Sequence, residues 1–138
     1  MKITYNFQTN FIFSNRKPIR NWINNTIVIK GKIPGEINFV FCSNAYILEI
    51  NKKHLNHDYT TDIITFDYSD NLMINGEIYI SIDEVKDNAK YFKTKFHDEL
   101  HRVMIHGILH LLGYKDKTNG EQKLMRSQED YYLSLRTF

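Results

Sequence analysis

Apolar and polar residues alternate in three stretches of the chain, and alternation with a period of two is typical of a β-strand with one buried face. These stretches cover residues 2–7, 37–41 and 62–68. A polar loop, SDNLMING, leads from the third stretch into the segment GEIYIS, which predicts an adjacent strand. Gly31 and Gly35 are expected to bracket the loop before the second stretch. The pattern therefore predicts four strands.

Apolar residues at helical spacing fill the intervals between and after these strands. Ser81 and Thr118 are each followed, three residues later, by a glutamate, which is the capping-box pattern of a helix start. Asn15 and Ser43 occupy similar positions before two further periodic segments. Another helix is expected over about residues 95–112.

The predicted order is strand, helix, strand, helix, two strands and three helices. Such an order favours an α+β fold in which one mixed four-stranded sheet is packed by about five helices. A chain of 138 residues is long enough to bury one hydrophobic core. We therefore expect a single compact domain over residues 1–138.

Charge and cysteine content narrow the class of protein. The net charge of +2 is too small to indicate a dedicated nucleic-acid binder by itself. The single cysteine, Cys42, cannot form an internal disulfide, and we expect it to be a small core residue at a strand end. The sequence has neither a run of about 20 apolar residues nor a signal-peptide pattern. These features predict a cytoplasmic protein without a membrane partner.

The helix expected over residues 95–112 carries four histidines in two pairs. At about 100° per residue, His106 and His110 share one face, and His97 and His101 lie on the opposite face. The second half of this helix is apolar around most of its circumference, which is typical of a buried helix. Buried imidazoles need polar partners, because an unpaired buried polar group costs about 1–3 kcal/mol. His97 and His101 have no third side chain nearby that could bind a metal ion together with them, and we expect both to lie at the surface.

One metal ion would satisfy both His106 and His110, which project side by side at positions i and i+4. Gly113 is placed to end the helix and reverse the chain, so that Asp116 returns over the two imidazoles. Two histidines, one carboxylate and an open fourth position describe a catalytic metal site on a buried helix. The alternative is a pair of core histidines hydrogen-bonded to the backbone. Gly107 is expected to admit a close backbone approach, and it stands where an H-E-x-x-H protease has its glutamate, which disfavours that class.

Three segments resemble the YbeY-type metalloendoribonucleases, a family of ribosomal-RNA maturation factors. The run HGILHLLGY at 106–114 resembles the family signature H-G-x-L-H-L-x-G-Y-D-H. The segment INKKHLNHDYTTDIITF at 50–66 is similar to the family's L-N-x-x-x-R-x-x-D-x-x-T-D-V-L-S-F. GEIYIS at 76–81 resembles its G-D-I-x-I-S strand. The matched region covers about residues 43–130.

The resemblance implies a compact α+β fold with one metal, usually Zn²⁺, in a basic cleft. It implies hydrolysis of single-stranded RNA, maturation of the 3′ end of small-subunit ribosomal RNA, and a role in ribosome quality control. By position, His106 and His110 are metal ligands, and the family's third histidine falls on Asp116. An oxygen ligand widens the choice of metal toward Mn²⁺ or Fe²⁺. A metal-bound water is the expected nucleophile, and no general base is assigned.

A second departure from the family is Leu55, which stands where the family has a phosphate-binding arginine. The nearest cations that could replace it are Lys52, Lys53, His54 and His57. Asp62, at the start of a strand, is expected to line the same cleft. Two rival functions stay open: a metallohydrolase that acts on a small molecule or a peptide, and a non-catalytic ribosome-assembly factor.

Overall fold

The predicted order of strands and helices is found in the computed structural model, which describes residues 2–57 and 60–138. The strands in these residues are β1 (Lys2–Phe7), β2 (Ile33–Cys42), β3 (Ile63–Asp67) and β4 (Met73–Ser81). The helices are α1 (Arg16–Ile29), α2 (Asn44–Ile50), α3 (Ile82–Phe92), α4 (Phe96–Leu111) and α5 (Asn119–Ser134). A short π-helical segment (Asn51–Leu55), here called the π-turn, extends α2.

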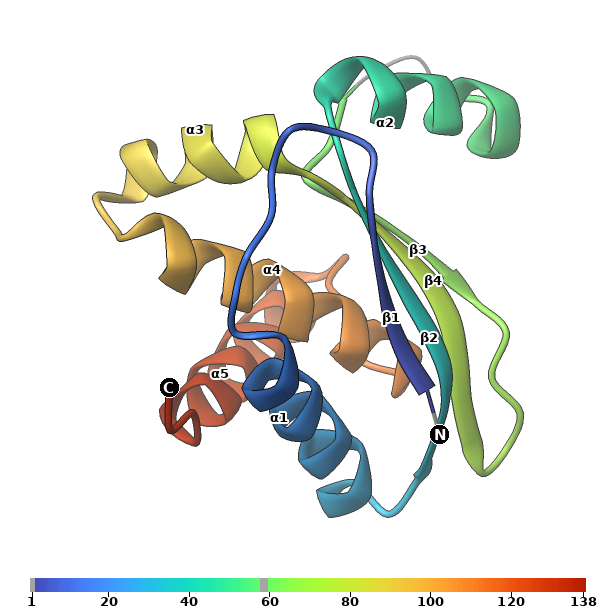
Figure 1. Ribbon diagram of the computed structural model, residues 1–138. Helices are drawn as coiled ribbons and strands as arrows, with labels where there is room; N and C mark the ends of the chain where they lie inside the picture. Colours follow the sequence, from blue (N-terminus) through green and yellow to red (C-terminus); the bar gives the residue numbers. More distant parts are fainter. Residues whose placement is uncertain (1, 58–59) are drawn as a thin grey trace.

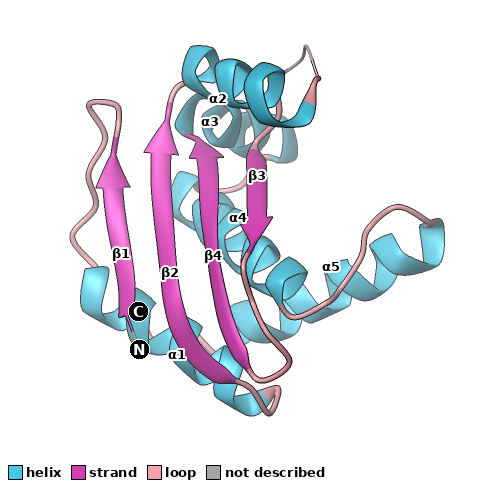
Figure 2. Ribbon diagram, turned by 90° about the vertical axis from the view of Figure 1, so that its right-hand side faces the viewer, coloured by secondary structure: helices cyan, strands magenta, loops and turns pink. Residues whose placement is uncertain are grey.

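The strands form one mixed sheet in the order β1-β2-β4-β3 (Figure 2). β2 pairs in parallel with both β1 and β4, whereas the edge strand β3 runs antiparallel to β4. Alternate strand residues face the main core, as the period of two predicts; they include Ile3, Ile37, Phe39, Phe41, Ile78 and Ile80. The predicted α+β class with a mixed four-stranded sheet is confirmed.

The helices divide unequally between the two faces of the sheet (Figure 1). α1, α3, α4 and α5 lie on one face and enclose the main core. α2 covers part of the other face, where Cys42, Ile47 and Ile64 form a second, smaller cluster. Cys42 is fully buried at the end of β2, as expected. Every helix within the described residues is too short or too polar to cross a bilayer.

α4 is the central helix of the larger layer and contacts β3, β4, α1, α3 and α5. These neighbours explain why its apolar residues cover most of its circumference. At Gly107 the helix comes close to the sheet, because a Cβ there would lie 3.0 Å from both Ile63 Cδ1 and Ile78 Cγ2. The expectation that Gly107 admits another backbone is therefore wrong: the groups that approach it are isoleucine side chains.

Two loops are shorter than the alternation predicted. β2 begins at Ile33 and β4 at Met73, so Gly35 and the residues MING belong to strands. The pairing of β2 with β4 is irregular beside Gly35. There, the Asn75 side chain accepts a hydrogen bond from the Glu36 N–H at 2.8 Å and occupies the space that a Cβ at Gly35 would need. The glycine thus marks a close approach within a strand, not the end of a loop.

The helix caps follow the sequence with two differences. Thr118 and the glutamate three residues later form the complete capping box of α5. Ser81 forms only half of one: its hydroxyl accepts from the Glu84 N–H, but its own N–H donates to the Asp62 carbonyl and is not free to pair with Glu84. Asn15 stands at the N-cap of α1 without a capping hydrogen bond from its side chain.

The chain reverses after α4 at Gly113, whose φ of 101° lies in the left-handed region. The Gly113 N–H donates to the His110 carbonyl, and the Tyr114 N–H donates to the Leu109 carbonyl. These two bonds are the pair that defines a Schellman motif, and a glycine is favoured at the reversing position because it has no Cβ. The predicted helix end is therefore confirmed.

Replacing Gly113 by alanine should lower the free energy of unfolding by about 1–2 kcal/mol, because a Cβ is strained at this φ. Gly120→Ala is the matched control, since Gly120 lies in the first turn of α5 with open space around it. We expect Gly120→Ala to be as stable as the wild type or up to about 1 kcal/mol more stable. Urea unfolding followed by circular dichroism measures both. Equal stability of Gly113→Ala and the wild type would contradict the assignment.

Candidate metal centre and its two clefts

Three side chains converge where α4 ends. His106 and His110 project from one face of α4, and Asp116 returns over them after the reversal at Gly113. The two Nε2 atoms are 3.0 Å apart, and Asp116 Oδ2 lies 3.2 Å from His106 Nε2 and 3.3 Å from His110 Nε2. Their side chains are 20%, 29% and 38% exposed, so the cluster is open to solvent and to ligands.

The spacing of these atoms suits one small divalent ion. Ligands placed tetrahedrally at Zn–N distances of 2.0–2.1 Å are about 3.3 Å from one another. The three measured separations, 3.0, 3.2 and 3.3 Å, are close to that value. Among the described residues, these three are the group of His, Cys, Asp and Glu side chains close enough together to hold a metal ion. Three ligands would leave a fourth position for water or substrate.

Glu129 of α5, which was not predicted from the sequence, fixes the orientation of the His106 ring through a hydrogen bond. Its Oε2 lies 2.6 Å from His106 Nδ1, and its Oε1 accepts from Arg102 Nη1 at 2.9 Å. The carboxylate accepts a hydrogen bond from the Nδ1–H of His106, so the Nε2 lone pair is directed toward Asp116 and an incoming ion. The sequence does contain a sign of this role, because Glu129 is a charged residue on the same stripe of α5 as the apolar residues Met125 and Tyr132.

Burial and charge act on two titratable groups here. Burial alone would lower the pKa of His106, but its hydrogen bond to Glu129 and the negative charges of Glu129 and Asp116 together raise it above its ordinary value. Burial raises the pKa of Asp62, although the nearby His106 opposes this. The Asp62 carboxylate accepts a hydrogen bond from the Asn88 amide at 3.3 Å.

One cleft, of about 570 Å³, opens between the cluster of His106, His110 and Asp116, strand β3 and the π-turn, and is here called the β3 cleft. The residues that line it include Leu55, His57, Thr61, Asp62, Lys117, His106, His110 and Asp116. Of the proposed substrate-binding residues, His57 and Asp62 line it, whereas Lys52 and Lys53 lie on the π-turn and do not. Lys117, which the sequence reasoning did not select, supplies a cation to this cleft.

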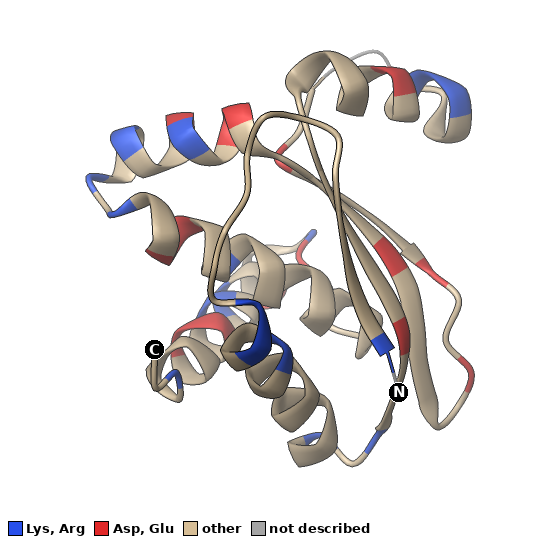
Figure 3. Ribbon diagram, in the orientation of Figure 1, with Lys and Arg blue, Asp and Glu red and all other residues tan. Residues whose placement is uncertain are grey.

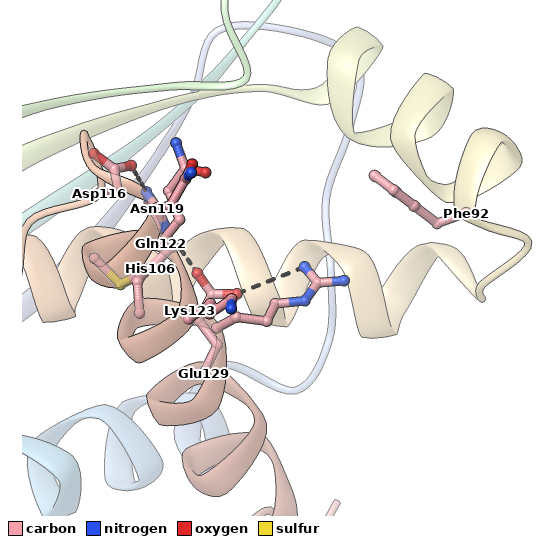
Figure 4. Close-up of a pocket in the computed structure, with 9 residues that line it drawn as sticks. Phe92, His106, Asp116, Asn119, Gln122, Lys123 and Glu129 are labelled. Carbon is pink, nitrogen blue, oxygen red and sulfur yellow. Dashed lines mark hydrogen bonds and ion pairs between the residues drawn. The ribbon is translucent and has the colours of Figure 1, made fainter.

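A second cleft, of about 610 Å³, lies on the other side of the cluster and is here called the α5 cleft (Figure 4). His106 and Asp116 line it as well, so the cluster stands where the two clefts meet. Phe92, at the end of α3, forms its far wall, and polar side chains from the first turns of α5 form the near one.

Comparison with known proteins gives one consistent result. The family model described as Endoribonuclease YbeY matches residues 4–136. An Endoribonuclease YbeY of Cytophaga hutchinsonii is 52% identical over 132 residues, which cover 94% of this chain and 92% of the relative. One of Flavobacterium psychrophilum is 49% identical over 133 residues, covering 96% and 95%. The solution structure of TM1509 from Thermotoga maritima superposes with a TM-score of 0.64 at 28% identity, covering 96% of this chain and 87% of that one.

The other histidine pair takes no part in the cluster, but the expectation that both members lie at the surface is wrong. His101 is only 5% exposed, because the rings of Trp22 and Phe138 pack against it. Arg136 Nη1 lies 2.7 Å from its Nδ1, which accepts the guanidinium hydrogen. Burial, together with the positive charges of Arg136 and His97, lowers the pKa of His101 to about 4. Segments far apart in the sequence cover this residue, so helix periodicity could not show its burial.

Buried, neutral His101 should make the protein less stable as the pH falls from about 6.5 to about 4. In this range the unfolded chain protonates His101 and the folded chain does not, so the free energy of unfolding decreases with falling pH. His101→Gln keeps an acceptor for Arg136 and cannot titrate. We expect its loss of stability between about pH 7 and pH 4.5, measured by urea unfolding, to be smaller than that of the wild type by about 2 kcal/mol. Identical pH dependence would contradict the assignment.

Proposed function

The chain belongs to the YbeY family of endoribonucleases, and on that premise we propose that it is a metal-dependent endoribonuclease specific for single-stranded RNA. We further propose that it matures the 3′ end of small-subunit ribosomal RNA and acts in ribosome quality control, and that residues 1–138 form one catalytic domain. Such work takes place in the cytoplasm, where ribosomes are assembled. The observation that carries the proposal is the convergence of His106, His110 and Asp116 at the junction of two clefts.

In this proposal His106, His110 and Asp116 hold one divalent metal. Two imidazoles favour Zn²⁺, and the carboxylate makes Mn²⁺ or Fe²⁺ acceptable as well. A metal bound there would polarise a phosphoryl oxygen and acidify a water molecule for attack on phosphorus. Asp116 also replaces a neutral ligand by an anion, so that water should be less acidic than at a site of three histidines.

Other groups of the β3 cleft bind and orient the RNA. Lys117 faces the same cleft as Leu55 and is the cation we assign to the scissile phosphate in place of the family's arginine. His57 contributes at the cleft wall, and Lys52 and Lys53 bind the RNA backbone farther from the ligands, on the π-turn. Burial raises the pKa of Asp62, which lines this cleft, and we therefore assign Asp62 as the general base that would accept a proton from the attacking water.

The metal assignment predicts that the purified wild-type protein contains metal by elemental analysis and that Asp116→Ala and His110→Ala do not. Asp116→His is the matched variant, because it restores the family's third imidazole and should retain the metal. We expect Asp116→Ala to weaken metal binding by more than about a hundredfold in a chelator competition, since even an indirect partner is worth about 10–100-fold. Retention of wild-type affinity by Asp116→Ala would show that the aspartate is not a ligand.

The activity predicts that the protein cleaves a single-stranded RNA oligonucleotide, that a chelator abolishes cleavage, and that the same sequence in a duplex resists it. Lys117→Gln should raise KM for RNA by about tenfold, because one phosphate contact is lost. Lys115→Gln is the matched control, since Lys115 lies two residues away and faces a different pocket.

Two results would contradict the proposed endoribonuclease activity and favour one of the two alternative functions. A peptidase or small-molecule hydrolase activity without RNA cleavage would identify a different metallohydrolase. RNA binding that persists without cleavage, after resupply of Zn²⁺, Mn²⁺ and Fe²⁺, would identify a non-catalytic assembly factor.

A further inference from the structure

The α5 cleft is a second route to the metal cluster, and neither the family motifs nor the β3 cleft accounts for it. Its volume of about 610 Å³ lies within the range of sites that hold small ligands. His106 and Asp116 line both this cleft and the β3 cleft. A chain-like substrate whose scissile bond lies at the cluster therefore has space on both sides of that bond.

Phe92 gives the cleft an aromatic wall. The apolar stripe of α3 begins with Val85 and Ala89, which are buried, but Phe92 at its end is 50% exposed and faces the cleft instead of the core. Arg126 of α5 reaches toward it, with its guanidinium carbon 5.9 Å from the ring centroid. An exposed aromatic ring with a cation beside it is the combination that proteins use to stack an unpaired base.

The charge of this cleft also suits a nucleic-acid backbone. Lys123 and Arg126 are exposed on its α5 side. The acidic group beside them, Glu129, is already paired with Arg102 and His106, and its distance to Arg126 is a longer 3.9 Å. Figure 3 shows the opposite charge along the sheet, where β2, β3 and β4 carry Asp and Glu but no Lys or Arg. Lys123 and Arg126 are therefore available to hold a phosphate on the α5 side of the cleft.

We propose that the α5 cleft binds the nucleotide next to the scissile phosphate, with its base stacked on Phe92 and its phosphate held by Lys123 and Arg126. The RNA strand then crosses the metal cluster from the β3 cleft to the α5 cleft. Asn119 and Gln122, which also line the cleft, supply amide groups that can pair with the exposed edge of an unpaired base. This inference rests on the proposed function for its ligand, and it gives a reason for single-strand specificity, since a paired base cannot leave its stack to reach Phe92.

Binding of a fluorescein-labelled single-stranded RNA to metal-free protein, measured by fluorescence anisotropy, tests the inference without any need for cleavage. Phe92→Leu keeps the apolar bulk but removes the π face, and we expect it to weaken binding about tenfold. Phe92→Tyr should bind as the wild type does. Tyr131→Ala is the control, because Tyr131 is 52% exposed on α5 and does not line the cleft.

A second variant tests the phosphate contact. Lys123→Gln should reduce the slope of log K against log salt by about 0.7, the value expected when one contact to a single strand is lost. Lys90→Gln, on α3 and outside the cleft, should leave the slope unchanged. Circular dichroism confirms that each variant is folded.

The outcomes separate this inference from the proposed function. Weaker binding by Phe92→Leu and Lys123→Gln supports the subsite even if the wild-type protein cleaves no RNA. Wild-type affinity in both variants overturns the subsite even if the protein is an active nuclease. Failure of the wild-type protein to bind single-stranded RNA overturns the inference as well.

Discussion

The close contact between α4 and the sheet at Gly107 positions the rest of the site. A Cβ at this point would lie 3.0 Å from side-chain atoms of Ile63 of β3 and Ile78 of β4, so a glycine lets the helix lie this near the strands without any shift of these two side chains. His106 precedes the contact and His110 follows it by one turn. Their imidazoles are therefore held at the rim of the core, where both are partly exposed, and not inside it.

Charge pairing between α4 and α5 completes this placement. Arg102 binds Glu129 at 2.9 Å and Asp130 at 2.7 Å, and Glu129 in turn binds His106. Glu129 is only 5% exposed, and a buried carboxylate without partners would be strongly destabilising. The network therefore ties the packing of two helices to the orientation of one imidazole. The ring that would hold the metal cannot rotate without breaking its hydrogen bond to a buried carboxylate.

The location of the cluster between two clefts links these packing contacts to the handling of RNA. In the β3 cleft, Leu55 stands where the resemblance to the family implies an arginine, and Lys117, one residue beyond Asp116, is a lysine that lines the same cleft. The same loop thus supplies Asp116 to the cluster and Lys117 to the cleft. His106 and Asp116 also line the α5 cleft, which extends to Phe92. Because His106 and Asp116 line both clefts, an RNA strand bound as we propose would have its reacting bond in its middle, as endonucleolytic cleavage requires.

Much of this was accessible from the sequence because it depends on spacing within one segment. Helical periodicity placed His106 and His110 on one face, the preference for glycine at helix ends placed the reversal at Gly113, and Asp116 follows His110 by only six positions. Strand alternation likewise gave the sheet, although it missed the irregular pairing beside Gly35.

Only the tertiary structure decided which distant residues meet. Glu129 reaches His106 across 23 positions, and Trp22 and Phe138 bury His101 from opposite ends of the chain. The packing of separate elements likewise places Lys117, and not Lys52 or Lys53, in the lining of the β3 cleft. Local spacing follows from the geometry of a single helix or strand, which the sequence alone specifies. Whether a residue is buried or lines a cleft depends on how separate helices and strands pack together, and the periodicity within one element carries no information about that packing.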